Sequence, residues 1–262
     1  MATGISASKR MYTSLYWPWL FVGAAWIVAV VATLTGQRFL IDHQFLLEES
    51  GLPWPLAAAL FLIGWQIMIA AMMAPTSIPF AGATLIDSTQ GNRWPHRPVA
   101  AFFTAYASAW TAFGALAFAG DTAIHHTVDA WPWLAAHSNV IGAATCAIAG
   151  LYQYSPWKSR SLARCRVRHL PATASTTSPW RLGLRHGIDS IVCCWALMLV
   201  MVGLGAGDLA WMAAIALMLL SETLLPGETA SRRARQIIGV AMLILAGLWL
   251  AHAVWVAPGA IS

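Results

Sequence analysis

Apolar runs of roughly 20 residues recur along the whole chain and constrain its fold more than any other feature. A helix of that length crosses a hydrocarbon core about 30 Å thick. Because lipid offers no hydrogen-bonding partners, the backbone groups of each run must be satisfied within the segment, which requires helices. Seven runs fit this description, at 17–36, 54–74, 100–120, 133–152, 188–204, 209–225 and 237–256. The sequence therefore predicts an all-α, polytopic membrane helix bundle with about seven transmembrane helices.

Composition excludes the soluble classes of enzyme. Hydrophobic residues make up 59% of the chain and charged residues only 10%. We find no phosphate-binding glycine loop, no paired-cysteine zinc spacing and no nucleophile motif. We expect one transmembrane domain over residues 1–262, surrounded by the lipid bilayer, and these patterns favour neither an enzyme nor a non-enzyme.

Basic residues predict the orientation, because positively charged loops stay on the cytoplasmic side. With seven spans and the N-terminus inside, fourteen of the fifteen Lys and Arg residues fall in cytoplasmic segments, and Arg38 lies outside. Lys9 and Arg10 precede a run of full span length without a small-residue cleavage site, so we expect the first span to be retained. We predict a cytoplasmic N-terminus, an outside C-terminus and the bacterial-type cytoplasmic (inner) membrane. The net charge of +5 then reflects topology and anionic lipid, and nucleic acid is not an expected partner.

The connection at about 155–185 is longer and more polar than the others, and residues 172–179 are typical of a flexible tether. Acidic residues inside apolar runs need partners. We expect Asp189 to pair with Arg185, one helical turn away. We expect Glu222 to hydrogen-bond at the interface or to pair with Arg232 or Arg233.

Sulfur-bearing residues gather near the predicted cytoplasmic ends of the spans. Cys193 and Cys194 lie a few residues into the fifth run, and Met68 and Met72 share a face of the second. Thiolate and thioether sulfur suit Cu(I), and thiolate also suits zinc, although both residue types also pack as hydrophobes. The candidate metal ligands on this side are Cys193, Cys194, Cys165, Met72, Met68, His186 and Asp189.

Three local features carry structural predictions. Cys146 lies mid-span among small residues, and we interpret it as a packing residue. Cysteines in the cytoplasmic half should be reduced, so we do not expect a disulfide. Pro75 and Pro79 should end or kink the second span.

Carboxylates and imidazoles form a second group at the opposite end of the spans. They are Asp121, His125 and Asp129 at intervals of four, with His126 beside them and His137 at the start of the next helix. If the third helix continues, the first three share a face, and such donors suit Cu(II), zinc or iron. The alternative is an exposed polar loop beside an aromatic belt. His43 and His252 map to the same side.

Several strings resemble the family named predicted metal-binding integral membrane protein, domain of unknown function 2182. They are Ala71–Pro75, Gly150–Lys158, Cys165–Arg166, Gly187–Met198 and Trp211–Ala213. The resembling region runs from about Leu60 to Glu228. The resemblance implies a membrane-embedded metal site and supplies no reaction.

The chain departs from that family's pattern where further cysteines are usual. Ser161 replaces one of them, and Ser190 and Val192 stand where the pattern has a cysteine and a glycine. The candidate thiols are therefore reduced to three. The site is either altered, recruiting Met72, His186 or Asp189, or it has lost its metal.

Three functions remain open. The first, which we favour, is a membrane protein that binds a soft metal, preferably copper, as a carrier, insertion factor or sensor. The second is a subunit of a membrane metallo-oxidoreductase whose ligands are Asp121, His125, His126 and His137. The third is a structural or assembly subunit of a membrane complex, without metal. Zinc or iron are the alternative ions, and other subunits are possible partners.

Overall fold

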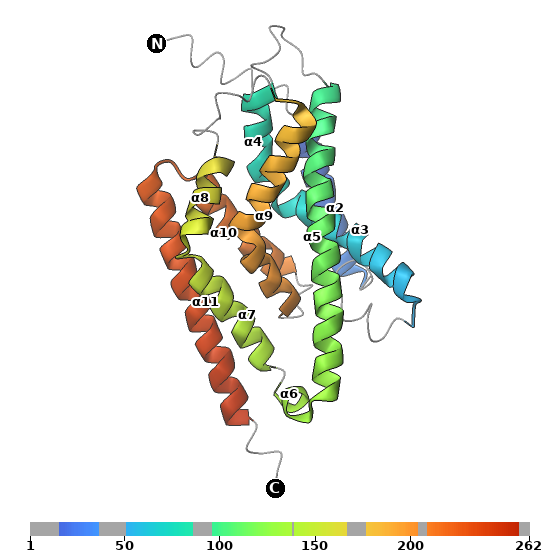
Figure 1. Cartoon of the computed structure of the whole chain (residues 1–262), viewed down its shortest axis with the longest axis vertical. Helices are drawn as coiled ribbons and strands as arrows, with labels where there is room; N and C mark the ends of the chain where they lie inside the picture. Colours follow the sequence, from blue (N-terminus) through green and yellow to red (C-terminus); the bar gives the residue numbers. More distant parts are fainter. Residues whose placement is uncertain are drawn as a thin grey trace.

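The computed structural model describes residues 16–36, 51–85, 96–137, 139–166, 177–203 and 209–256. All regular secondary structure in these residues is helical (Figure 1). The predicted all-α class is therefore confirmed.

Five of the described helices are long and apolar enough to cross a membrane. They are α2 (Tyr16–Leu34), α3 (Trp54–Met72), α5 (His96–Ala130), α9 (Pro179–Gly203) and α11 (Glu228–Val256). Two other predicted spans are shorter apolar helices, namely α7 (Asn139–Tyr152) and α10 (Leu209–Leu224), with 14 and 16 residues. At 1.5 Å per residue they extend about 21 and 24 Å, less than the hydrocarbon core of about 30 Å. The structure is that of a membrane-type helical protein with five helices of spanning length among the described residues.

A break in the helix at Met73 separates α3 from α4 (Ala74–Leu85). Pro75 has no N–H with which to continue the helical bond to the Ala71 carbonyl, and that carbonyl accepts from the Trp26 indole at 3.1 Å instead. The predicted break is confirmed, and Pro79 lies inside α4.

Two short helices cap the longer ones, α6 (Pro132–Ala136) and α8 (Pro156–Cys165). Ser155 caps α8 by accepting from the Trp157 N–H at 3.2 Å, and Pro156 occupies the first turn, where its missing N–H has no consequence. The polar connection expected at 155–185 therefore contains α8 and the start of α9. The expected tether lies mostly outside the described residues.

Helices α5 and α9 lie side by side and approach closely through two glycines one turn apart on α9 (Figure 1). A Cβ atom added at Gly187 would lie 2.9 Å from the Cβ of Ala109, and one at Gly183 would collide with the carbonyl of Phe102. Small residues permit such close backbone approach between helices in membranes. This packing fixes which face of α9 points into the bundle.

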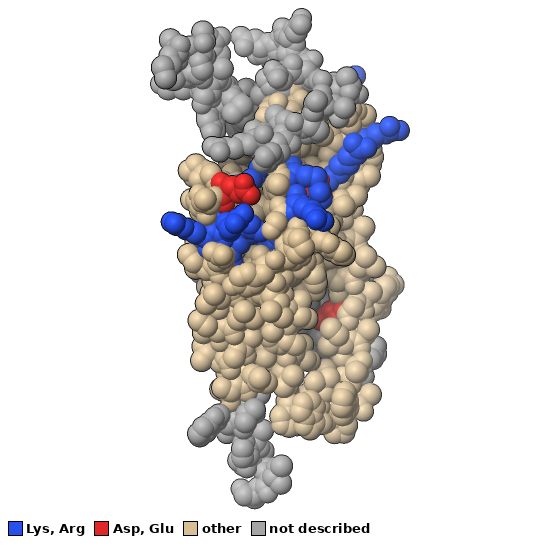
Figure 2. Space-filling view, turned by 60° about the vertical axis from the view of Figure 1, so that its left-hand side comes forward, with Lys and Arg blue, Asp and Glu red and all other residues tan. Residues whose placement is uncertain are grey.

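The outer surface has the charge pattern of a membrane protein. Figure 2 shows Lys and Arg gathered toward one end of a face that is otherwise almost uncharged. On α11, Ile237, Val240, Ile244 and Leu248 are exposed at helical spacing, which gives the helix an apolar outward stripe suited to lipid. Charged residues at the end and apolar residues along the sides are what a bilayer requires.

We predict that Gly183→Ala destabilises the fold, because the added methyl group must push α9 away from the Phe102 carbonyl. Overpacking of this kind costs about 1–3 kcal/mol. Gly120→Ala on α5 is the matched control, since a Cβ there meets nothing within 4 Å and alanine favours a helix. Unfolding in detergent measures both variants, and equal stability of the two would contradict the close packing.

Candidate metal centre

A small buried cavity of about 20 Å³ brings three thiols, a thioether and an imidazole to one place. Its walls come from the α3–α4 break, the end of α8, one face of α9, and α10. The lining residues are Met73, Thr76, Cys165, His186, Ser190, Cys193, Cys194, Leu219 and Thr223. A cavity needs roughly 10–15 Å³ to hold one water molecule, so this one has room for a single monatomic ion.

One face of α9 supplies four of these residues. His186, Ser190 and Cys194 follow one another at intervals of four and therefore share that face. Cys193 lines the same cavity, and 4% of Cys193 and 2% of Cys194 are exposed. The Cys194 Sγ donates to the Ser190 carbonyl at 2.7 Å and lies 3.8 Å from the Sδ of Met73. A thiol and a thioether are thus in contact at the cavity wall.

Met73 reaches the cavity because the helix breaks at this residue. Its carbonyl accepts from the Thr76 N–H, the Thr76 hydroxyl and the Ser77 hydroxyl, at 3.2, 2.8 and 3.2 Å. The sequence favoured Met72 and Met68, but the structure places Met72 in the core and Met68 against it, and neither is among the lining residues. Pro75 is the sequence feature that could have pointed to Met73, because the helix break at this proline changes which methionine faces the cavity.

His186 is buried, with one ring nitrogen bonded and the other free to act as a ligand. Its ring stacks on Phe80, with the ring centroids 4.2 Å apart. The Ser77 hydroxyl donates to the Met73 carbonyl, so its oxygen accepts from Nε2 of His186 at 3.1 Å. This assigns the proton to Nε2 and a lone pair to Nδ1. Nδ1 has no hydrogen-bond partner among the described residues. A neutral imidazole with an unused lone pair is a common metal ligand.

Cys165 reaches the cavity from the last residue of α8. Burial raises the pKa of its thiol well above the ordinary value, and the neighbouring thiol of Cys193 raises it further. The preceding residue, Arg164, holds Oδ1 of Asp189 through Nε at 2.7 Å and Nη2 at 2.6 Å. The expected pairing of Asp189 with Arg185 is therefore wrong, because this face of α9 is turned toward α8.

A buried ion pair lies beside the cavity. The Lys158 Nζ is 2.8 Å from the Glu222 Oε2, and both side chains are at most 1% exposed. The pair is close enough to interact electrostatically with Cys193. The expected pairing of Glu222 with Arg232 or Arg233 is wrong, because Lys158 of α8 is the partner instead. The pair ties α8 to α10 next to the thiols.

The donor atoms surround the cavity without meeting at one point. In the described part of the chain, no group of three or more His, Cys, Asp or Glu residues could hold a metal ion as the side chains now stand. Cys194 is bonded to the Ser190 carbonyl and His186 to the Ser77 hydroxyl. A bound ion therefore requires the Cys194 thiol to turn from the Ser190 carbonyl.

Ser190 and Ser161, at which the sequence departs from the pattern it resembles, lie in or near this centre. Ser190 lines the cavity, and its hydroxyl is 3.1 Å from the Tyr106 hydroxyl. Ser161 is buried and accepts from Nη2 of Arg164 at 3.2 Å. All four cysteines are free, and Cys146 is fully buried in the hydrophobic core away from the cavity lining.

The second candidate group lies along α5. This helix continues to Ala130, so the condition for Asp121, His125 and Asp129 to lie on one helix is met. Asp121 is buried. The side chains of His125, His126 and Asp129 lie outside the described ones, and their role as ligands stays a prediction.

His137 and His252, on the same side, each have a hydrogen-bonding partner. We expected His137 at the start of a helix, but it lies at the C-terminal end of α6. Its ring stacks on Trp133, and its Nδ1 lies 2.8 Å from the Trp133 carbonyl. His252 lies 3.3 Å from the Asn139 amide nitrogen. His43 lies outside the described residues.

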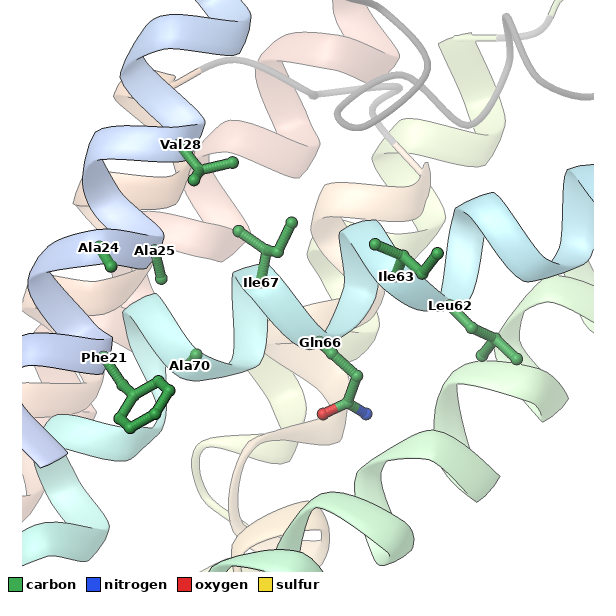
Figure 3. Close-up of a pocket in the computed structure, with 9 residues that line it drawn as sticks. All are labelled: Phe21, Ala24, Ala25, Val28, Leu62, Ile63, Gln66, Ile67 and Ala70. Carbon is green, nitrogen blue, oxygen red and sulfur yellow. The ribbon is translucent and has the colours of Figure 1, made fainter.

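A wider groove of about 550 Å³ opens between α2 and α3 (Figure 3). Its lining is apolar except for Gln66, whose amide nitrogen donates to the Thr111 hydroxyl at 2.8 Å. With no sulfur, imidazole or carboxylate in its lining, the groove lacks metal ligands. The small cavity is therefore the better metal centre, although the groove is larger.

Comparison with known proteins gives one match. The family model described as PpoB2, copper chaperone, matches residues 62–250, which include every residue of the cavity lining. The expectation that the chain resembles a metal-related family is therefore confirmed. No curated protein and no solved structure matches the chain.

We predict that Glu222→Gln strongly destabilises the protein, because it leaves the Lys158 ammonium buried without a counter-charge. Breaking a buried pair on one side costs about 3–5 kcal/mol. The double variant Lys158→Met/Glu222→Gln should recover most of this loss. Glu228→Gln is the control, because its pair with Arg232 is exposed and 3.9 Å long, and it should leave stability unchanged. Denaturant unfolding in detergent measures the free energy of unfolding of each variant. A Glu222→Gln variant as stable as wild type would refute the role of the pair.

Proposed function

The chain belongs to the PpoB2 family of copper chaperones, and from this premise we propose that it is a membrane-embedded carrier of Cu(I). One observation supports the small cavity as the place where the ion binds. Three thiols, a thioether and an imidazole line the same small cavity, inside the region that matches the family. The protein receives one ion there, holds it and passes it on.

The donor set fits Cu(I) better than it fits hard ions. Thiolate and thioether sulfur select Cu(I), whereas carboxylate and carbonyl oxygens suit magnesium and calcium. The sulfur atoms of Cys194 and Met73 lie 3.8 Å apart, so both would be close to an ion placed between them. The distance between the two sulfurs therefore supports a shared ion.

Loading the ion changes the bonding of the cavity. Metal binds thiolate, so the Cys194 proton that now bonds to the Ser190 carbonyl leaves when the ion enters. His186 offers the lone pair of Nδ1 on another part of the wall without losing a proton. The Lys158 ammonium beside the thiols favours the negative charge that the thiolates bring, and the Glu222 carboxylate paired with it opposes that charge.

In the proposed topology the chain crosses the bacterial-type inner membrane seven times, with its N-terminus in the cytoplasm and its C-terminus outside. Helices α7 and α10 complete the seven, as short spans within the bundle. The concentration of basic residues toward one end supports this orientation. The cavity then lies toward the cytoplasmic side, because α8 and the first half of α9 belong to the basic segments.

A carrier is preferred to an insertion factor or a sensor. The cavity has room for one monatomic ion, which suits temporary holding. When no ion is bound, the Cys194 thiol is bonded to the Ser190 carbonyl, so this donor returns to a protein partner when the cargo leaves. The partners of such a carrier are the bilayer and an acceptor of copper.

The test is Cu(I) loading of the purified protein in mild detergent under reducing conditions. We expect about one copper per chain in wild type, and loss of that copper in Cys193→Ser/Cys194→Ser, because two of the three thiols are removed. Cys146→Ser is the matched control, since this thiol is equally buried but does not line the cavity. Elemental analysis after gel filtration gives the stoichiometry, with zinc loading in parallel.

Other outcomes would favour other functions. Copper retained in the double cysteine variant but lost in His125→Ala/His137→Ala would move the ion to the opposite end and favour a metallo-oxidoreductase subunit. Absence of copper from the wild type would favour a structural or assembly subunit.

A further inference from the structure

The three thiols of the cavity differ in the elements that carry them. Cys193 and Cys194 lie within α9, a helix of spanning length packed closely against α5. Cys165 is the last residue of α8, a ten-residue helix that is not among the candidate spans. It is also the most exposed of the three, at 9% against 4% and 2%. One thiol therefore lies at the edge of the centre, on a separate and shorter element.

The two ends of α8 are held differently. Near its start, Lys158 is fully buried against Glu222, which fixes that end to α10. At its other end, Arg164 and Asp189 form an ion pair whose side chains are 56% and 21% exposed. Exposed ion pairs contribute little to stability. The end that carries Cys165 is thus the more easily released.

A second contact limits how far that end moves. Nη2 of Arg166 donates to the Glu222 carbonyl at 2.7 Å. This bond lies next to the buried Lys158–Glu222 pair. The helix can therefore shift at Cys165 while both neighbouring contacts keep it attached to α10.

We propose that Cys165 is the exchange ligand of the centre, the thiolate that closes the site over Cu(I) and leaves first when copper passes to an acceptor. The inference rests on the proposed function of the cavity. During transfer the bond from copper to the Cys165 sulfur breaks, and a bond from copper to a soft donor of the acceptor forms. Copper stays Cu(I) throughout, no electron moves, and the Cys165 thiolate takes up a proton from water. Cys193, Cys194 and Met73 hold the ion until the acceptor has bound it.

The experiment measures release of copper from the loaded, full-length protein to bathocuproine disulfonate, a Cu(I) chelator whose complex absorbs visible light. Cys165→Ser should still bind one copper per chain but release it roughly 10- to 100-fold faster than wild type, the range by which supporting groups around a metal alter its retention. X-ray absorption at the copper edge should show one sulfur fewer around the ion. A residue with a merely structural role would not change the sulfur count.

The contact that holds Cys165 in place gives an independent test. Asp189→Asn removes the charge opposite Arg164 and should speed release about tenfold with the sulfur count unchanged. Glu228→Gln is the matched control, because it removes the charge of another exposed pair, with Arg232, and neither residue lines the cavity. It should release copper at the wild-type rate.

Two results would overturn the inference while leaving the proposed function standing. One is release from Cys165→Ser at the wild-type rate with the same sulfur count. The other is loss of all copper from Cys165→Ser, as complete as in Cys193→Ser/Cys194→Ser, with Cys165→Ala behaving alike. Absence of copper from wild type would instead remove the proposed function itself. The outcomes for the two proposals are therefore distinguishable.

Discussion

A charge inside an apolar bundle must be paired, and the pairing of Lys158 with Glu222 determines much of the rest of this structure. The two groups meet at 2.8 Å with almost no exposure, so neither can be left alone without a large cost in free energy. Because Lys158 belongs to α8 and Glu222 to α10, the pair brings a short polar helix into a bundle of apolar ones. Cys165, two turns further along α8, reaches the other thiols as a consequence.

The close packing of α9 against α5 provides the second condition for the centre. Glycines at 183 and 187 let the two helices approach until a methyl group would not fit between them. With α9 turned in this way, His186 and Cys194 face inward. The break at Met73 then adds a thioether opposite the thiols. The chemistry of the cavity therefore follows from three separate packing events, and none of them involves a metal.

The centre combines donors from a long helix with one from the end of a short helix, an arrangement that fits the proposed carrier role. Two thiols and an imidazole come from one long helix, which suits retention of an ion. The third thiol comes from a helix end held by an exposed ion pair and by the bond from Arg166 to the Glu222 carbonyl, and the weakness of the exposed pair suits exchange. Without an ion, the Cys194 thiol is bonded to the Ser190 carbonyl and Nε2 of His186 to the Ser77 hydroxyl.

The sequence alone determined the fold class, the sulfur-rich end of the bundle and the helix break, because hydrophobic run length, residue type and proline act locally. It also identified Cys165, Cys193, Cys194 and His186 as candidates, all of which line the cavity. It did not predict the partners of Asp189 and Glu222, since the nearest basic residues along the helix were not the nearest in space. It favoured Met72 over Met73, because the direction of a side chain at a helix break depends on the backbone angles there. Tertiary structure decided these points, since pairing across helices depends on how each helix is turned against its neighbours, and no local pattern carries that rotation.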